Sequence, residues 1–562
     1  MVVEHFTFMN KFNLSKTVTL VALLIILIIG GFLRIYKIDS TPPSLNWDET
    51  AVGYNAWTIA NYGKDEWGKD FPVSFKSFGE EKLPVHIYTT AIFVKLFGLT
   101  PLSTRLPSAI FGILSILMIY LLAKELFQNK IVGLIAAFVL ALSPFQFSFS
   151  RFNHELNFAI FFFMFGIWLF LKSFNTKKYL LGLSFLSFCL SFLSYNASKI
   201  VVPLMVVLLV ALFHKDLVKN KINLLVSLCF IVILIGTIFL NSELLGLTRA
   251  QQTSFSQDEI KNTKLYKKTN NLYLGTFDLA FSKYILYFNQ SYLFEKGDKN
   301  PILSTQYSGQ FLKIDQLFLI FGVVFIIFEA SKKKFNPKTN QVKLMVFLFV
   351  WALVAPIPGS FSNEAPHSAR ALFMIGSWHI IISYGIYRLI SLFKYLKFLN
   401  SKIPISLATI LFVFLYLFSA KNYLVDYFEK YSQRYAIEWQ YGMRESVEYT
   451  KDHPELERVF VTDLRSQPYI FFLYFLKTPP SKLLETVVYN DSDKNKSFNN
   501  ISSFDKYFFG GWDTVESMPI PNILYVLTSS EFDGLRHKNE FNVEKEVKLP
   551  NGSVAFYLVR GL

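Results

Sequence analysis

Thr17–Leu33, TVTLVALLIILIIGGFL, is an uninterrupted apolar run, and the polar segment Asn46-Trp47-Asp48-Glu49-Thr50 follows it closely. An α-helix needs about 20 apolar residues to cross the hydrocarbon core of a bilayer, so the run predicts a transmembrane helix. Ionised carboxylates are costly in apolar surroundings. The adjacent pair Asp48-Glu49 therefore indicates a functional site at a membrane surface.

Similar apolar runs recur along the chain, which has 562 residues and is 52% hydrophobic. Soluble domains do not repeat runs of spanning length, so the pattern predicts a polytopic α-helical membrane protein with about eleven transmembrane helices. The first run lacks the small-residue cleavage site of a signal peptide, and we expect it to be retained. The runs are Thr17–Leu33, Leu102–Leu122, Ile131–Phe147, Leu156–Leu171, Tyr179–Leu193, Ile200–Phe213, Leu224–Leu240, Leu317–Phe328, Leu344–Ile357, Ala371–Ile386 and Ile405–Phe418.

The net charge of +15 comes from lysines that cluster in alternate short loops. This asymmetry predicts a cytoplasmic N-terminus and argues against nucleic acid as a partner. The predicted location is the cytoplasmic membrane, and the first extracytoplasmic loop spans 36–101. Within it, we expect the short apolar stretch Leu83–Leu99 to form an interfacial helix. The lysine-rich loops are Lys124–Lys130, Lys177-Lys178, His214–Lys221, Ser331–Lys343 and Arg388–Lys402.

The chain divides into a transmembrane catalytic domain, residues 1–420, and a small extracytoplasmic α/β domain, residues 421–562. In the second part, short apolar runs predict strands at Arg458–Thr462, Ile523–Leu527 and Ser553–Val559. Asn551-Gly552 predicts a hairpin turn before the last of these strands. The two cysteines, Cys189 and Cys229, lie in apolar runs and are expected to be packing residues.

Four polar clusters at the ends of the apolar runs fall on the predicted outer face. Charged residues at span ends are often only interfacial anchors. Here, however, carboxylates, histidines and cations occur together on one face, as a reaction site requires. A carboxylate would take a proton from an attacking hydroxyl or amine, and the cations would hold an anionic group such as a phosphate. The clusters are Asp48-Glu49 with Gly63–Gly68 and Gly79–Lys82, then Arg151–Glu155, Tyr195–Lys199 and Glu364–Arg370.

The motifs in and around these clusters resemble a known group of enzymes, the bacterial polyprenyl-phosphate-sugar glycosyltransferases. These belong to the GT-C superfamily and are similar to protein O-mannosyltransferases and the lipid A aminoarabinose transferase. The likeness covers about residues 15–420. It rests on Trp47–Ala56, Gly63–Pro72, Leu83–Tyr88, Leu96–Gly98, Thr104–Pro107, Ser150–Glu155, Tyr195–Lys199 with Pro203, and Pro366–Arg370.

The resemblance implies an inverting transfer of one sugar from a polyprenyl-phosphate donor to an extracytoplasmic lipid, glycan or protein acceptor. The expected catalytic residues are Asp48, as the base, Glu49 beside it, and Glu155, which matches a second acidic residue of related enzymes. The donor phosphate would bind Lys199, Arg370, His367 and Arg151, although many relatives have Arg where Lys199 stands. The residues expected to bind substrate are Trp47, Tyr54, Asn55, Glu80, Glu81, Tyr195 and Glu364.

No cofactor is required by this pattern, although the carboxylates with His86, His154 or His367 are able to bind a divalent metal. A transporter or flippase of lipid-linked sugar is an alternative, but it would place charges within its spans. An oligosaccharyltransferase would carry a Trp-Trp-Asp-Tyr-Gly motif, of which Glu438-Trp439-Gln440-Tyr441-Gly442 is only an echo. A polymerase or ligase of lipid-linked glycans would not predict the Asp48-Glu49 pair.

Overall fold

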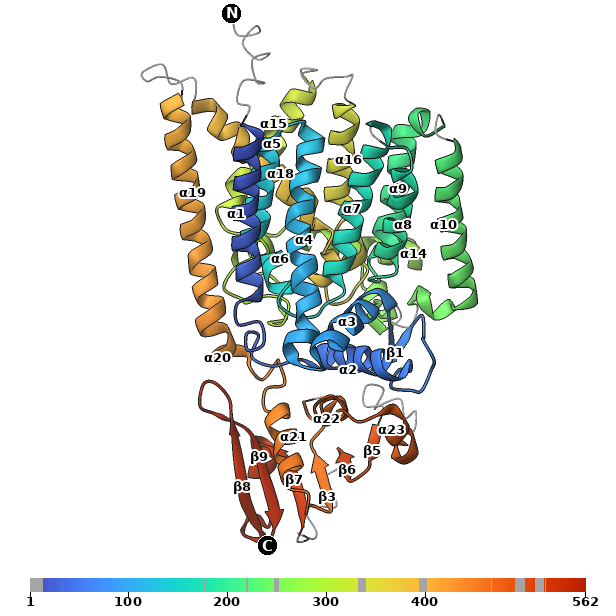
Figure 1. Cartoon of the computed structure of the whole chain (residues 1–562), viewed down its shortest axis with the longest axis vertical. Coiled ribbons are helices and arrows are strands. Elements are labelled where there is room, and N and C mark those ends of the chain that lie inside the picture. Colours follow the sequence, from blue (N-terminus) through green and yellow to red (C-terminus); the bar gives the residue numbers. More distant parts are fainter. Residues whose placement is uncertain are drawn as a thin grey trace, which may run out of the picture.

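The computed structural model describes residues 14–562 except 176, 219–220, 247–251, 332–339, 394–401, 466, 491–500, 511–519 and 521. A bundle of long helices stands above a layer of short helices, and a sheet domain lies below that layer (Figure 1). Most of the predicted lysine-rich loops Ser331–Lys343 and Arg388–Lys402 falls outside the described residues.

Each predicted apolar run falls on a helix of the bundle, which confirms a polytopic α-helical membrane protein. Among the described residues, seven helices are long and apolar enough to cross a membrane. The total of about eleven spans stays a prediction. The helices of the bundle are α1 Lys16–Ile35, α4 Pro101–Phe127, α5 Lys130–Leu142, α7 Leu156–Asn175, α8 Leu180–Phe192, α9 Ser198–Leu217, α10 Lys221–Leu240, α15 Asp315–Ser331, α16 Gln341–Val354, α18 Met374–Leu392 and α19 Lys402–Val425.

The first loop folds as a layer across one end of the bundle, built from α2 Trp47–Tyr62, the hairpin of β1 Phe75–Ser77 and β2 Glu80–Lys82, and α3 Pro84–Phe97. Asn46 caps α2, because its side chain accepts a hydrogen bond from the Glu49 amide and Glu49 reaches back to Asn46. Pro84 occupies the first turn of α3, where the missing amide hydrogen costs nothing. α3 lies across the end of the bundle, as expected of an interfacial helix (Figure 1).

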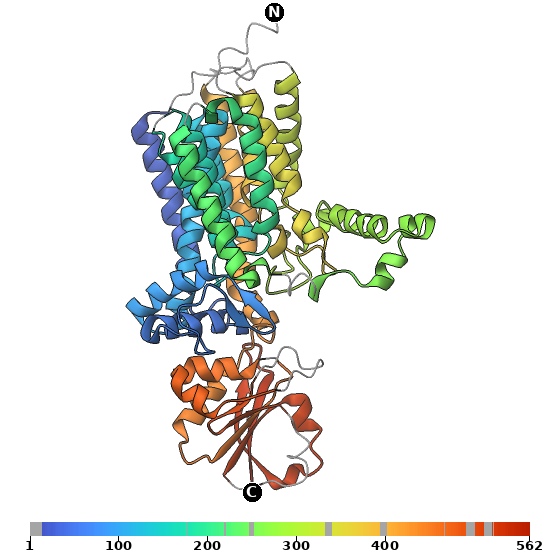
Figure 2. The same ribbon diagram turned by 90° about the vertical axis from the view of Figure 1, so that its right-hand side faces the viewer.

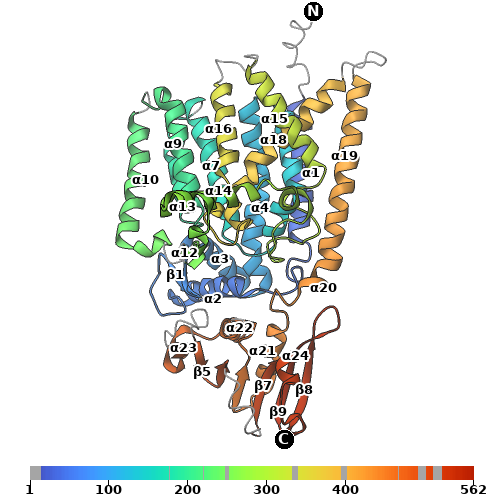
Figure 3. The same ribbon diagram turned by 180° about the vertical axis from the view of Figure 1, so that it is seen from behind.

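A second connection, between α10 and α15, carries an arm of three short helices that extends sideways from the bundle (Figure 2). Seen from behind, α12 to α14 lie in front of the bundle helices (Figure 3). The short helices here and between α16 and α18 are η3 Ser242–Leu245, α12 Gln257–Lys261, α13 Lys264–Thr269, α14 Leu272–Leu286, η4 Ser291–Glu295, α17 Ile357–Ser360 and η6 Ala369–Ala371, and α6 Pro144–Phe149 follows α5.

The C-terminal part contains the predicted sheet. Its order is β4-β5-β6-β3-β7-β9-β8, with a parallel core of β6, β3 and β7. All three predicted strands are present, and Gly552 adopts a φ of 89° in the predicted hairpin turn between β8 and β9. The strands are β3 Arg458–Val461, β4 Val488–Tyr489, β5 Ile501–Phe504, β6 Tyr507–Phe509, β7 Ile523–Thr528, β8 Phe541–Lys548 and β9 Val554–Gly561.

Helix α19 runs on across residue 420, where the sequence placed the domain boundary, and that boundary stays a prediction. The helical elements that follow α19 are η8 Asp426–Lys430, α20 Tyr431–Tyr435, α21 Met443–Asp452, α22 Pro468–Leu476, α23 Pro480–Thr486, α24 Ser529–Asp533 and η9 Lys538–Glu540. One hydrophobic core joins α2 and α3 of the first loop to α22 and the sheet, through residues such as Ala51, Ile87, Phe472 and Phe509. The shared core fixes the sheet domain against the layer that carries Asp48.

Candidate active site

A cavity of about 660 Å³ lies where the first-loop layer meets the end of the bundle. All four predicted polar clusters contribute side chains to it, although they come from distant parts of the chain. Mixed carboxylates and cations in a single cavity of this size are typical of a reaction site. From the four clusters in turn come Asp48, Glu80 and Glu81, then His154 and Glu155, then Tyr195 and Lys199, and then Glu364, His367 and Arg370.

Asp48 is bound by a buried lysine that was not among the predicted site residues. Lys82 is only 5% exposed, and its Nζ donates to Asp48 Oδ1 at 2.6 Å and to Glu80 Oε1 at 3.4 Å. Glu80 and Lys82 are two residues apart on β2, so the pleat turns both toward the same side. Burial alone would lower the pKa of Lys82, but Asp48 and Glu80 outweigh it and raise the pKa, which keeps the ammonium charged. The polar segment Gly79–Lys82 was the signal that pointed to this lysine.

The other oxygen of Asp48, Oδ2, accepts a hydrogen bond from Trp47 Nε1 at 3.1 Å. The Asp48 side chain nevertheless remains 49% exposed. It is therefore held in place by Lys82 and Trp47 while open to a molecule in the cavity. This arrangement suits a general base, which has to be both positioned and accessible.

Glu155 lies in the same cavity, with Oε2 3.4 Å from Nδ1 of His154. Burial alone would raise the pKa of Glu155, but His154, His86 and Lys82 outweigh it and hold the pKa at about 2. Burial lowers the pKa of His86 to about 4. Among the described residues, neither ring nitrogen of His86 has a hydrogen-bond partner. Glu155 is therefore an ionised carboxylate near neutral pH.

Glu49, the neighbour of Asp48, points away from the cavity and is fully buried. Its Oε1 accepts hydrogen bonds from Arg105 Nε at 2.9 Å and from the backbone amide of Asn153 at 2.9 Å. Its Oε2 accepts from the second Arg105 nitrogen at 2.9 Å. Glu49 thus ties α2 to α4 and to the segment that leads to Glu155. The geometry supports a positioning role and not the catalytic one that the resemblance implied.

Three more residues expected at the site have contacts elsewhere. Tyr54 donates its hydroxyl hydrogen to the carbonyl of Thr478 at 2.7 Å, and Asn55 accepts from the amide of Glu66 at 3.0 Å. Arg151 donates to the carbonyls of Leu33, Tyr36 and Thr41 at 2.5, 2.7 and 2.7 Å. Since Tyr54, Asn55 and Arg151 do not line the cavity, the geometry lends no support to their predicted substrate roles.

The cations on the bundle side of the cavity lie on two segments. Arg370 donates to Glu364 Oε2 at 2.6 Å and to the hydroxyl of Ser362. Asp298 accepts from the amide of Ser368 at 2.5 Å and so fixes the loop that carries Arg370. Lys199, at the start of α9, donates to the amide oxygen of Asn196. Arg370 and Lys199 are thus placed to hold an anionic group inside the cavity.

Metal binding was left open by the sequence. Within the part of the chain that is described, no group of three or more His, Cys, Asp or Glu side chains is arranged to hold a metal ion. Burial first and then the nearby Glu243 raise the pKa of the cavity residue Glu81 to about 7. A divalent metal therefore stays a prediction of the sequence.

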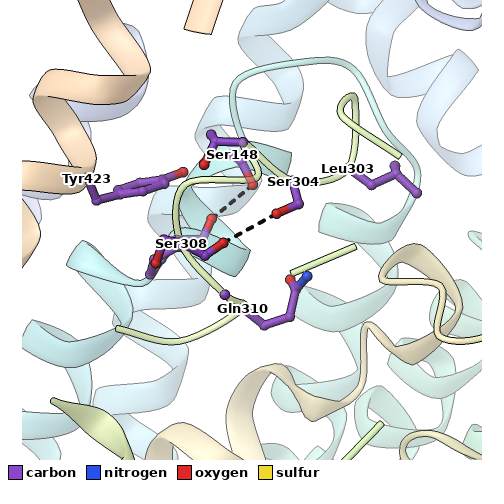
Figure 4. A pocket seen from close by; sticks show the side chains of 9 residues that line it. Ser148, Leu303, Ser304, Ser308, Gln310 and Tyr423 are labelled. Atoms are coloured by element: carbon purple, nitrogen blue, oxygen red, sulfur yellow. Dashed lines mark hydrogen bonds between the residues drawn. The ribbon is translucent and has the colours of Figure 1, made fainter. Parts of the chain in front are cut away.

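A smaller hollow lies beside the first, and Leu303 borders both (Figure 4). It is lined by Ser148, Ser304, Ser308, Gln310 and Tyr423 and contains no charged side chain. Ser304 donates to the carbonyl of Lys296 at 2.9 Å, and Gln310 donates to the hydroxyl of Ser368 at 2.7 Å. Since these polar groups are already paired within the chain, the larger cavity is the better candidate for chemistry.

Residues 81–239 match the protein family described as dolichyl-phosphate-mannose-protein mannosyltransferase. A curated relative, the putative mannosyltransferase YkcB of Bacillus subtilis, is 31% identical over 162 residues, which make up 28% of this chain and 21% of that protein. The match therefore spans about a fifth of the relative's length.

The fold resembles those of solved membrane enzymes. ArnT from Cupriavidus metallidurans has a TM-score of 0.52 at 11% identity, covering 97% of this chain and 98% of that one. The structure of ArnT bound to undecaprenyl phosphate has a TM-score of 0.51, also at 11% identity and with the same coverage of both chains. The oligosaccharyltransferase of Archaeoglobus fulgidus has a TM-score of 0.50 at 16% identity, and the match covers 82% of this chain and 64% of that one. At these identities the likeness concerns the fold. It confirms the expected fold, a bundle of membrane helices with a small C-terminal sheet domain, and the resemblance of that fold to these enzymes.

Proposed function

We propose that this chain is a membrane glycosyltransferase that transfers a sugar from a polyprenyl-phosphate donor to an extracytoplasmic acceptor with inversion. The observation that carries the proposal is a cavity lined by an accessible carboxylate, Asp48, together with the cations Lys82, Lys199 and Arg370. The family match and the undecaprenyl phosphate bound by ArnT, a protein with a similar fold, support a lipid-linked donor.

The lipid tail of such a donor stays in the bilayer, so its phosphate has to be met at headgroup depth. The cavity lies at the end of the bundle, where Lys199 is in the first turn of α9 and Arg370 precedes α18. Both cations would neutralise the phosphate, which makes it a better leaving group. The lysine-rich loops belong to the opposite ends of the helices, which supports a cytoplasmic end there and an extracytoplasmic cavity.

In the proposed step, an acceptor hydroxyl oxygen attacks the anomeric carbon of the donor sugar from the side opposite the phosphate. A new C–O bond forms, the bond from the anomeric carbon to the phosphate oxygen breaks, and polyprenyl phosphate leaves with the bonding electron pair. The acceptor proton goes to Asp48. Lys82 balances the negative charges of Asp48 and Glu80. A single displacement inverts the configuration of the anomeric carbon.

Two alternative functions have less support. An oligosaccharyltransferase is compatible with the fold, but the Glu438–Gly442 segment lacks the acid between the aromatic residues. In a transporter, charged side chains would line a path through the bundle. Here the charges of the candidate cavity gather at one end of it.

The test is a reaction of the purified full-length protein with a panel of polyprenyl-phosphate sugars, combined with mass spectrometry of lipids and glycans from cells with and without the gene. We expect release of polyprenyl phosphate from one donor and loss of one glycosylated product without the gene. If no donor releases polyprenyl phosphate and the lipid and glycan profiles are identical, the proposal is wrong.

A further inference from the structure

Gln467, which precedes α22, is the described residue of the C-terminal part that lines the cavity. Gln467 is only 3% exposed and has a φ of 53°, which turns the chain sharply between β3 and α22. Among the described residues, its Oε1 has no hydrogen-bond partner. Buried polar atoms are nearly always paired, so this unpaired amide oxygen beside the cavity is a candidate acceptor for a hydrogen bond from a bound molecule.

The position of Gln467 is fixed by close packing between α22 and α2. A Cβ atom at Gly53 of α2 would lie 2.6 Å from the ring of Tyr474 and 2.7 Å from the hydroxyl of Thr104. Only a glycine leaves room for this approach. Tyr474 also shares a hydrogen bond of 2.8 Å with Thr104 of α4. The helix that follows Gln467 is therefore locked against both the first-loop layer and the bundle.

A second glutamine of the C-terminal part holds the helix that bears the base. Gln440 Oε1 accepts from the backbone amide of Trp47 at 3.2 Å, directly before Asp48. Gln440 is itself buried. The C-terminal part thus positions Asp48 from one side, through Gln440, and presents Gln467 to the same cavity from a second segment.

Three of the side chains that line the cavity suit a carbohydrate. Trp47 and Phe78 line the cavity together with Gln467. Aromatic rings pack against the apolar faces of sugars, and a neutral amide binds hydroxyl groups without the desolvation cost of a charge. The cations that suit a phosphate, Lys199 and Arg370, come from other segments. The cavity therefore combines cations that suit a donor phosphate with aromatic rings and a neutral amide that suit a sugar, next to the carboxylate of Asp48.

We propose that Gln467 belongs to an acceptor subsite that binds a molecule with several hydroxyl groups, such as a sugar ring. One hydroxyl gives its proton to Asp48 in the transfer step, and a second donates a hydrogen bond to Gln467 Oε1. This inference rests on the proposed glycosyl transfer and narrows its acceptor to a glycan.

The test uses the full-length protein in detergent with a polyprenyl-phosphate sugar as donor and either an alkyl glycoside or a serine-containing peptide as acceptor. The variant Gln467→Met keeps the length of the side chain and removes the amide. We expect its KM for the alkyl glycoside to rise on the order of tenfold, as loss of a buried hydrogen bond predicts. The affinity for polyprenyl phosphate and the rate of donor hydrolysis by water should stay within about twofold of the wild-type values, because Gln467 does not contact the donor in this proposal. Gln433→Met, at an exposed glutamine of α20, is the matched control.

An unchanged KM in Gln467→Met would overturn the inference while leaving the glycosyl transfer intact. Transfer to the peptide, with no transfer to the glycoside, would overturn the carbohydrate acceptor. Absence of both transfer and donor hydrolysis in the wild-type protein would overturn the proposed function and this inference with it. Retained donor affinity and hydrolysis in Gln467→Met show that the variant is folded.

Discussion

Lys82 Nζ lies 2.6 Å from Asp48 Oδ1, although 34 positions separate the two residues. The lysine is buried and the carboxylate is half exposed, so the pair presents its negative member to the cavity. Because a buried ammonium fixes the nearby carboxylate, Asp48 is preorganised before any substrate arrives. A positioned charge of this kind lowers the reorganisation needed during a reaction.

Replacing Asp48 by Asn should abolish sugar transfer, because an amide cannot accept the acceptor proton. We expect a loss of at least about 100-fold in the rate of transfer, as for removal of a general base. The rate of transfer is measured as release of polyprenyl phosphate by the purified variant. Its membrane insertion and size-exclusion profile should match the wild type. Transfer at the wild-type rate would mean that another group is the base.

Replacing Arg370 by Ala should weaken binding of the donor, because the guanidinium is the cavity cation best suited to bidentate contact with phosphate. We expect a rise in the dissociation constant for polyprenyl phosphate on the order of tenfold, measured by thermal shift or scintillation proximity. Arg444→Ala, which breaks an exposed ion pair with Glu448 on α21, is the control. Equal affinities of the two variants would remove Arg370 from the phosphate site.

Replacing Glu49 by Ala should destabilise the protein, because Arg105 would stay buried without its counter-charge. Removal of one partner from a buried ion pair typically costs about 3–5 kcal/mol. Thermal unfolding in detergent should show a clear decrease in Tm. Glu448→Ala, at an exposed pair worth about 0–1 kcal/mol, should leave Tm almost unchanged. A wild-type Tm in the Glu49 variant would refute the positioning role.

Replacing Gly53 by Ala should push α22 away from α2, since the new methyl group would collide with Tyr474 and Thr104. Overpacking of this kind costs about 1–3 kcal/mol. The matched variant Gly236→Ala lies on α10 with no atom within 4 Å. It should be neutral or stabilising by up to about 1 kcal/mol, because alanine is the better helix former. Opposite signs of the two Tm shifts would support the tight packing, whereas equal shifts would contradict it.

The depressed pKa of Glu155 predicts a loss of stability in acid. The folded-state pKa is about 2, below the ordinary value of 4.5, so the unfolded chain binds the proton first as the pH falls. The stabilisation is complete above pH 4.5 and is lost as the pH falls toward 2. Tm should therefore decrease less between neutral and acid pH in Glu155→Gln than in the wild type. Parallel Tm curves would show that Glu155 does not titrate in this way.

The sequence predicted those features that depend on neighbouring residues. Long apolar runs predicted the bundle helices, short apolar runs predicted β3, β7 and β9, and Asn551-Gly552 predicted the hairpin turn before β9. The four polar clusters were also found, because charged residues at the ends of apolar runs stand out locally. Lys82 also lies within one of these clusters. No local pattern distinguishes it from other lysines, since its burial beside Asp48 depends on how the β1–β2 hairpin folds against α2.

By itself, the sequence determined that this chain is a multi-pass membrane protein with reactive groups at the helix ends, because hydropathy and capping act over a few residues. Only the tertiary structure decided which of those groups are buried as positioning residues and which are accessible in the cavity. It buried Glu49 against Arg105, left Asp48 open, and brought Gln440 to Trp47 across 393 positions of sequence. Such contacts depend on how whole segments pack, and no local pattern encodes which side of a helix will face the cavity.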